Sequence, residues 1–187
     1  MDNTDGFLYP LQIYTSSPSL KNYSSAEQVI VSLIYSAKKS IYIITPYLSL
    51  TESVENALCF ASKSNIDVKI IIPGVPDKKF VYRATLFTGE NLLKKGIKVY
   101  TYKSGFAHAK MIIIDDACVN ISSINFDYRS FYFSFEIGVN VYSSDFAKIA
   151  KDNLDKVFAE STPVVNKNHK FSQRVLDYLS MVFRTYF

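Results

Sequence analysis

The chain is 187 residues long, with 48% hydrophobic and 20% charged residues. This length fits one mid-sized domain, and the composition excludes wholesale disorder because enough apolar surface is present to build a core. The two cysteines, Cys59 and Cys118, lack the spacing of a disulfide scaffold or a zinc site. The sequence shows no secretory signal and no apolar stretch long enough to span a membrane, so we expect a cytoplasmic protein.

The net charge is only +4, but the basic residues are unevenly distributed. Residues 78–110 hold eight Lys or Arg against one acid, whereas residues 111–160 hold eight acids against four bases. A solvated helix face accounts for most of these lysines, and a basic zone beside an anionic phosphate ligand is compatible with the same pattern.

The first part of the chain predicts alternating helices and strands. Residues 1–23 form a polar lead-in with one strand, and Ser24 or Ser25 then begins a capping-box pattern followed by a helix to about residue 40. Strands are predicted at 41–44, 66–72 and 97–102, and helices at 52–63 and 79–95. Parallel strands need helical crossovers, so this alternation favours an α/β layer.

After residue 102 the alternation ends. Three strand patterns without intervening helices, at 111–114, 118–121 and 136–142, extend the same sheet in a partly antiparallel manner, and helices follow at 145–158 and 171–185. We therefore predict an α/β domain with a mixed, mostly parallel sheet flanked by helices. The single domain would cover residues 1–187, with a lead-in at 1–23, a body at 24–160, and a tail with a C-terminal helix at 161–187.

Four polar residues are predicted to meet at one edge of this sheet. In an extended chain, residues two apart share a face, so His108 lies with Lys110, and Ser123 lies with Asn125 on the next strand. The set suits a phosphodiester. An imidazole is a nucleophile near neutral pH, an ammonium neutralises a phosphoryl oxygen, and a hydroxyl and an amide donate hydrogen bonds.

The pattern His108-x-Lys110-x4-Asp115-x6-Ser122-Ser123-x-Asn125 resembles the HxK(x)4D(x)6GSxN motif of the phospholipase D superfamily. Further segments resemble the carboxy-terminal half of bacterial cardiolipin synthases, and the similarity covers about residues 24–160. These segments are Thr45-Pro46-Tyr47, Pro73-Gly74-x-x-Asp77, Gly105-Phe106 and the stretch 125–131.

The resemblance implies a phospholipase D-like fold and a two-step transfer. A motif histidine attacks phosphorus and forms a phosphohistidine, a second motif histidine protonates the leaving alcohol, and an incoming alcohol or water resolves the intermediate. No metal ion and no other cofactor are implied. His108 would be the nucleophile or the general acid, and Glu136 would orient the histidine. The resemblance places catalytic positions at His108, Lys110, Asp115 and Glu136, and phosphate-binding positions at Lys110, Ser123 and Asn125.

Several of these residues also have structural interpretations. Ser123 and Asn125 could cap the turn after their strand, and Glu136 could instead pair with Arg129. Asp115 follows a buried strand and is better placed for a structural role than for proton transfer. We expect the aromatic run 131–135 to belong to the core.

The sequence also departs from the family pattern. Ser122 stands where the motif has Gly, Ser134 stands where cardiolipin synthases have Asn, and one copy of the motif is present where the chemistry uses two. We therefore expect phosphatidyl transfer of the cardiolipin synthase type, with phosphatidylglycerol or a related phospholipid as substrate. The site would be composite, completed by a homodimer or by a separate first-half chain, peripherally bound at the surface of the cytoplasmic membrane.

Two alternatives remain open at this stage. One is a single-motif nuclease or phosphodiesterase that works as a homodimer, and the other is an inactive half that keeps a phosphate-binding pocket. A nucleic-acid partner, which the sequence favours less, would bind through the basic residues between Lys78 and Lys103.

Overall fold

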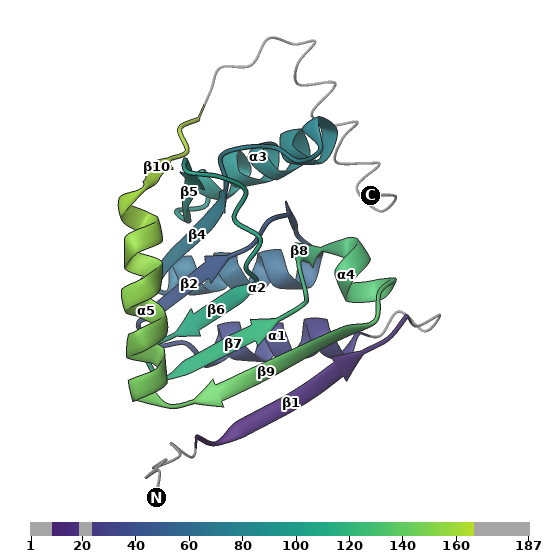
Figure 1. Cartoon of the computed structure of the whole chain (residues 1–187), viewed down its shortest axis with the longest axis vertical. Helices are drawn as coiled ribbons and strands as arrows, with labels where there is room; N and C mark the ends of the chain where they lie inside the picture. The colour runs from purple at the N-terminus through teal and green to yellow at the C-terminus, as the bar shows by residue number, and fades with distance from the viewer. Residues whose placement is uncertain (1–8, 19–23, 167–187) are drawn as a thin grey trace, which may run out of the picture.

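The computed structural model describes residues 9–18 and 24–166 (Figure 1). An eight-stranded sheet with the order β1-β9-β7-β6-β2-β4-β5-β10 dominates the fold, and β3 and β8 form a separate pair. The strands are β1 (Leu11–Ser16), β2 (Ser40–Ile44), β3 (Leu48–Ser49), β4 (Asp67–Pro73), β5 (Lys98–Tyr102), β6 (Met111–Ile114), β7 (Cys118–Ser122), β8 (Phe126–Asp127), β9 (Glu136–Tyr142) and β10 (Ser161–Pro163). The helices are α1 (Ser25–Ser36), α2 (Glu52–Lys63), α3 (Lys79–Leu93), α4 (Tyr128–Tyr132) and α5 (Ser144–Ala159).

The predicted mixed α/β sheet flanked by helices is confirmed. Strands β2, β4 and β5 are parallel neighbours, and α2 and α3 provide the crossovers between them. Strands β6, β7 and β9 continue the sheet with antiparallel pairing, as expected. Five of the eight strands run in one direction. The other three, β6, β9 and β10, have only neighbours of the first direction, so five of the seven neighbouring pairs are antiparallel.

Local contacts account for where helix α1 begins and where it ends. The side chain of Ser24 accepts a hydrogen bond from the Glu27 amide at 3.1 Å, so the first capping box is the one used. Helix α1 ends at Ser36 rather than near residue 40. The backbone amides of residues 38–40 bind the Asp115 carboxylate instead, and Ser40 begins β2.

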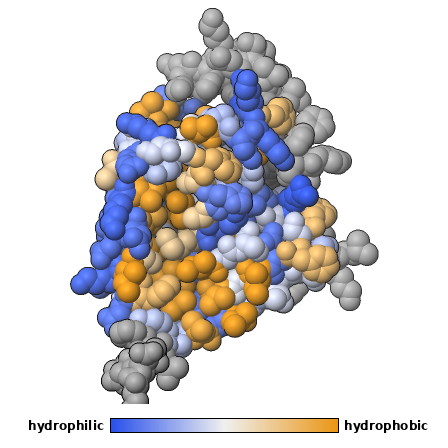
Figure 2. Space-filling model, viewed as in Figure 1, coloured by the Kyte–Doolittle hydropathy of each residue, from blue (hydrophilic) through white to orange (hydrophobic). Residues whose placement is uncertain are grey.

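The two faces of the sheet are covered unequally. Helices α1, α2 and α3 pack on one face and bury the larger core. On the other face, Ala147, Ala150 and Leu154 of α5 pack against Ile113 and Val119. Within residues 9–18 and 24–166, no helix covers the face of β7, β9 and β1 beyond α5, and we refer to this part of the sheet as open. Figure 2 shows the apolar side chains that gather over this open part. We call it the apolar sheet face; its exposed members are Leu11, Ile13, Ile121 and Ile137, and Met111 and Val139 are half-buried beside them.

The prediction that the aromatic run belongs to the core is correct for Phe131 and for Tyr132, which is half-buried against the core, and wrong for Phe133 and Phe135. Phe131 is fully buried and packs edge-on against Phe126. Phe133 and Phe135 are 58% and 83% exposed. The chain leaves α4 after one short turn and becomes extended toward Ile137. Alternate side chains therefore point outward along this segment.

Other features were not predicted or cannot be compared. The short elements β3, β8, α4 and β10 have no periodic signal of their own in the sequence. The predicted C-terminal helix at 171–185 lies outside the described residues. Among the helices that the structure describes, none combines the length and the apolar character needed to cross a membrane.

Candidate active site

The segment that holds His108 and Lys110 is a loop between β5 and β6, and it brings the two side chains together. Lys110 Nζ lies 3.0 Å from Nε2 and 3.2 Å from Nδ1 of His108, and it also donates to the His108 carbonyl at 2.8 Å. The His108 ring stacks on Phe106 with centroids 5.7 Å apart, and Phe106 contacts the Tyr47 ring at 6.2 Å. Aromatic rings thus support the exposed imidazole from one side.

The end of β7 lies next to this loop. The Ser122 amide donates to the Lys110 carbonyl at 3.1 Å, which continues the β6–β7 ladder up to the motif. Ser123 Oγ donates to the Glu136 carboxylate and accepts from the Ile137 amide at 3.0 Å. Sequence reasoning left Glu136 with either a histidine or an arginine partner, and the structure pairs it with Ser123.

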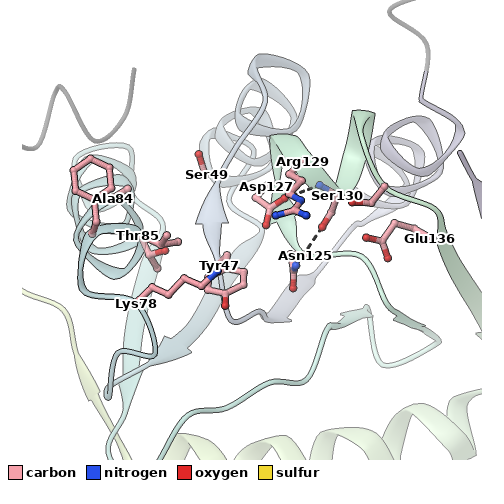
Figure 3. Close-up of a pocket in the computed structure, with 13 residues that line it drawn as sticks. Tyr47, Ser49, Lys78, Ala84, Thr85, Asn125, Asp127, Arg129, Ser130 and Glu136 are labelled. Atoms are coloured by element: carbon pink, nitrogen blue, oxygen red, sulfur yellow. Dashed lines mark hydrogen bonds between the residues drawn. The ribbon is translucent and has the colours of Figure 1, made fainter. Parts of the chain in front are cut away.

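Asn125 belongs to a buried polar network rather than to a simple turn. Its Nδ2 donates to Ser130 Oγ at 3.2 Å, and the Ser130 amide donates to Asp127 Oδ1 at 2.7 Å (Figure 3). The Asn125 Oδ1 is buried and has no hydrogen-bond partner within the described chain.

Asp115 does not join this group, although the motif places it among the catalytic positions. It stands at the opposite end of β6, in the tight turn to β7, where Asp115 and Asp116 both have φ of 53°. Its carboxylate accepts from the amides of Lys38, Lys39 and Ser40 at 2.7, 2.7 and 2.8 Å. These contacts support the structural role that we expected for Asp115, because the acid ties the α1–β2 connection to the β6–β7 hairpin.

A cavity of about 250 Å³ opens beside Asn125, between α3 and α4 (Figure 3). Strands β3 and β8 lie between the two helices, and most of the lining residues have polar side chains. The lining residues are Tyr47, Ser49, Lys78, Phe80, Val81, Ala84, Thr85, Asn125, Asp127, Arg129, Ser130, Ser134 and Glu136.

Sequence reasoning missed most of this lining. Tyr47 and Asp127 stood inside segments that carried the family resemblance, so their positions could have been noted as candidate site residues. Ala84 and Thr85 carry no signal in the sequence, because only the packing of α3 brings them to the cavity.

Burial and neighbouring charges set the ionisation of the site. Burial lowers the pKa of Lys110, and the Glu136 and Asp127 carboxylates oppose that shift. Burial raises the pKa of Asp127, hydrogen bonds from Ser130 oppose the change, and the Glu136 charge adds to it. Burial and the hydrogen bond to Asp77 raise the pKa of Tyr47 to about 12, so its hydroxyl stays protonated. The part of the chain that the structure describes holds no group of three His, Cys, Asp or Glu side chains able to bind a metal ion.

Comparison with solved structures defines the class of fold. The phospholipase D family member Nuc from Salmonella typhimurium superposes with a TM-score of 0.68 at 23% identity, over 83% of this chain and 98% of that chain. A phosphatidylserine synthase from Haemophilus influenzae Rd KW20 superposes with a TM-score of 0.74 at 15% identity, over 95% of this chain and 46% of that chain. The fold is that of a phospholipase D-like domain.

Sequence comparison then identifies the family. Residues 30–158 match the family described as cardiolipin synthase, PLD-like domain, and the chain belongs to this family. It is 42% identical to cardiolipin synthase 1 of Staphylococcus aureus (strain COL) over 139 residues. This aligned stretch covers 74% of this chain and 28% of the relative. It is also 42% identical over 138 residues to the major cardiolipin synthase of Bacillus subtilis (strain 168), with the same two shares. The chain spans about a third of the length of such curated relatives.

Proposed function

We propose that the chain provides one catalytic half of a phosphatidyl transferase of the cardiolipin synthase type. The observation that carries this proposal is the contact between His108 and Lys110 beside a polar cavity, in a chain that belongs to the cardiolipin synthase family. Membership of the family supports phosphodiester chemistry, and the geometry supplies a nucleophile with a cation next to it.

The reaction proceeds in two displacements at phosphorus. A ring nitrogen of His108 attacks the phosphorus of phosphatidylglycerol, the bond to the headgroup oxygen breaks, and glycerol leaves with a proton from a general acid. The headgroup hydroxyl of a second phosphatidylglycerol then attacks the phosphohistidine, gives its proton to the same group, and releases His108. The products are cardiolipin and glycerol. The Lys110 ammonium, 3.0 Å from Nε2, stabilises the phosphoryl oxygens in both steps.

The proton donor must stand opposite His108 across phosphorus, so we place it on a partner: a second copy of this chain or a separate first-half chain. The apolar sheet face supports this proposal because contiguous exposed apolar surface marks interaction sites. Met111 of that face directly follows Lys110, and Ile137 exchanges hydrogen bonds with Ser123. A partner that covers the face therefore borders on the motif. Since the substrate is a membrane lipid, the assembly would work peripherally at the surface of the cytoplasmic membrane.

A product assay tests the function. The purified chain, alone and mixed with the amino-terminal half of a cardiolipin synthase, is incubated with vesicles of labelled phosphatidylglycerol and, separately, with DNA. We expect cardiolipin and glycerol in equal amounts. Phosphatidic acid would show that water resolves the intermediate, and cut DNA would support the nuclease alternative. Absence of every product in both mixtures would overturn the proposal.

A further inference from the structure

The cavity between α3 and α4 is the right size for a small polar group and too small for acyl chains. Pockets that hold drug-sized ligands measure about 300–1,000 Å³, and this cavity measures about 250 Å³. Any phosphodiester that binds at the motif carries two alcohol arms. In a phospholipid with a glycerol headgroup one arm is a diacylglycerol and the other is a three-carbon polyol, and only the polyol fits a space of this size.

The cavity reaches the motif from two sides. Asn125, a predicted phosphate ligand, and Glu136, which binds Ser123, are part of the lining. On another side, Tyr47 lines the cavity and contacts Phe106, on which the His108 ring stacks. A phosphate held beside His108 therefore directs one of its arms into the cavity.

The lining suits an uncharged ligand with several hydroxyl groups. Two cations, Lys78 and Arg129, and two carboxylates, Asp127 and Glu136, line the cavity, so their formal charges cancel. A phosphate dianion or an ammonium headgroup would meet groups of its own sign, whereas a hydroxyl can donate to the carboxylates and accept from the cations. Figure 3 shows that these groups come from different sides, with Lys78 beside α3 and Arg129 on α4.

One buried acceptor has no partner to satisfy it. Asn125 Nδ2 donates to Ser130 Oγ at 3.2 Å, and this contact orients the amide. The Asn125 Oδ1 is then left buried without a hydrogen bond in the described chain. A buried carbonyl oxygen without a donor is costly, and a ligand hydroxyl at the cavity would satisfy it.

We propose that this cavity binds the glycerol arm of the phosphodiester, with Asn125, Asp127 and Arg129 selecting a polyol headgroup. The inference rests on the proposed function, because it assumes a phosphodiester at His108. The same pocket serves both displacements: glycerol leaves from it in the first, and the headgroup of the second phosphatidylglycerol enters it in the next. The leaving and attacking alcohols are then chosen by one set of contacts.

Binding of water-soluble probes to the chain tests this proposal without turnover. Glycerophosphoglycerol is the phosphatidylglycerol headgroup without acyl chains, the methyl ester of phosphoethanolamine has an ammonium arm and no polyol, and dimethyl phosphate has neither a polyol nor an ammonium arm. By NMR titration we expect glycerophosphoglycerol to bind at least five-fold tighter than dimethyl phosphate and tighter than the methyl ester of phosphoethanolamine.

Two variants fill the cavity without changing a charge. Ala84→Leu places a larger side chain on the cavity wall of α3, and Ser49→Leu does so from β3. Each should reduce glycerophosphoglycerol binding to the level of dimethyl phosphate and leave dimethyl phosphate binding unchanged. Ala159→Leu, at an exposed position near the end of α5, is the matched control and should bind like the parent chain.

The outcomes separate this inference from the proposed function. Selective binding that the filling variants remove supports the pocket even if the chain transfers no phosphatidyl group. Equal binding of all probes, no binding of any probe, or full selectivity in a folded Ala84→Leu or Ser49→Leu variant would overturn it. Thermal unfolding of each variant shows whether it is folded.

Discussion

At the scale of single residues, the environment of Lys110 determines what the motif can do. Its ammonium lies against both ring nitrogens of His108 and close enough to Glu136 and Asp127 for their charges to act on it. Burial disfavours the charged form, so the carboxylates help to keep the lysine protonated. A protonated lysine at this position stabilises negative charge on the transferring group, whereas a neutral amine would compete with His108 as a nucleophile.

We therefore predict that turnover depends on both Lys110 and His108. Lys110→Met keeps the length of the side chain and removes its charge, and kcat should fall on the order of 10²–10³-fold. His108→Ala should abolish turnover and also the acid-labile label on the protein after quenching with radiolabelled substrate. Lys103→Met, an exposed lysine near the same loop, is the control. Turnover that survives in a folded His108→Ala variant would remove the proposed mechanism.

The position of Asp115 leads to a prediction about stability rather than activity. Its carboxylate accepts three backbone hydrogen bonds from residues 38–40, and hydrogen bonds to charged groups are each worth about 1.5–3 kcal/mol. Asp115→Ala should lower the free energy of unfolding by at least about 2 kcal/mol, measured by urea denaturation. Asp116→Asn, in the same turn and with the same φ of 53°, should change it by less than about 0.5 kcal/mol. Equal effects of the two variants would contradict the assigned role.

At the scale of secondary-structure elements, periodic segments were predictable and short ones were not. The helix at 52–63 and the strands at 111–114 and 136–142 were predicted with the bounds that the structure shows. The helix and the strand at 136–142 follow an apolar period, and residues 111–114 are a continuous apolar run. The pair β3 and β8 has two residues in each strand, and tertiary contacts rather than any period form it. Thr45 illustrates this: its hydroxyl accepts from the Phe126 amide at 3.2 Å and joins chain segments that are 81 residues apart.

The candidate site was predictable only as far as the motif extended. Alternation in an extended chain was enough to bring His108 next to Lys110, and the motif spacing carried Ser123 and Asn125 to the neighbouring strand end. The cavity was beyond sequence reasoning because its lining comes from α3, β3, β8 and α4, whose mutual packing has no local signature.

The junction of β4 and β5 provides a test of acid stability. Asp67 on β4 contacts Lys69 at 2.8 Å and Lys98 on β5 at 2.7 Å. Burial alone would raise the pKa of Asp67, but hydrogen bonds and charge from the two lysines outweigh it and lower the pKa from 3.8 to about 2. The folded state therefore holds the proton less tightly than the unfolded chain. The stabilisation is complete above pH 4 and disappears as the pH falls through about 2.

Thermal unfolding from pH 7 to pH 2 checks this prediction. Asp67→Asn should melt below the parent chain at neutral pH, and the gap in Tm should close between about pH 4 and pH 2. Asp152→Asn, an exposed carboxylate on α5, should follow the parent chain across the whole range. A gap for Asp67→Asn that stays constant down to pH 2 would contradict the link between this ion pair and acid stability.

At the scale of the whole molecule, the uncovered part of the sheet and the motif lie next to each other. Helix α5 covers one part of its face of the sheet, while Ile121, Ile137 and Ile13 remain exposed on the other part. In Figure 2 the hydrophilic centre of the molecule borders this apolar area. One partner would therefore cover the apolar sheet face and also bring a second acid to His108. An isologous pair of two copies of this chain is the simplest such arrangement.

If the chain alone turns over phosphatidylglycerol, sedimentation should show a dimer or a larger even assembly, because two copies of His108 must face one phosphate. Ile121→Glu places a charge on the apolar sheet face, 45% exposed in the single chain, so it should give a folded monomer with turnover reduced at least 100-fold. Ile149→Glu makes the same change at a 56% exposed position on α5 and should keep both assembly and turnover.

Two results would decide against the composite site. A strictly monomeric parent chain with full turnover would show that one motif is sufficient. An Ile121→Glu monomer that retains turnover would show that the apolar sheet face does not bring the second acid. If the parent chain is an inactive monomer, adding a separate first half should restore its turnover. The first half should not restore turnover to Ile121→Glu, because it would bind the same apolar sheet face as the second copy does in a homodimer.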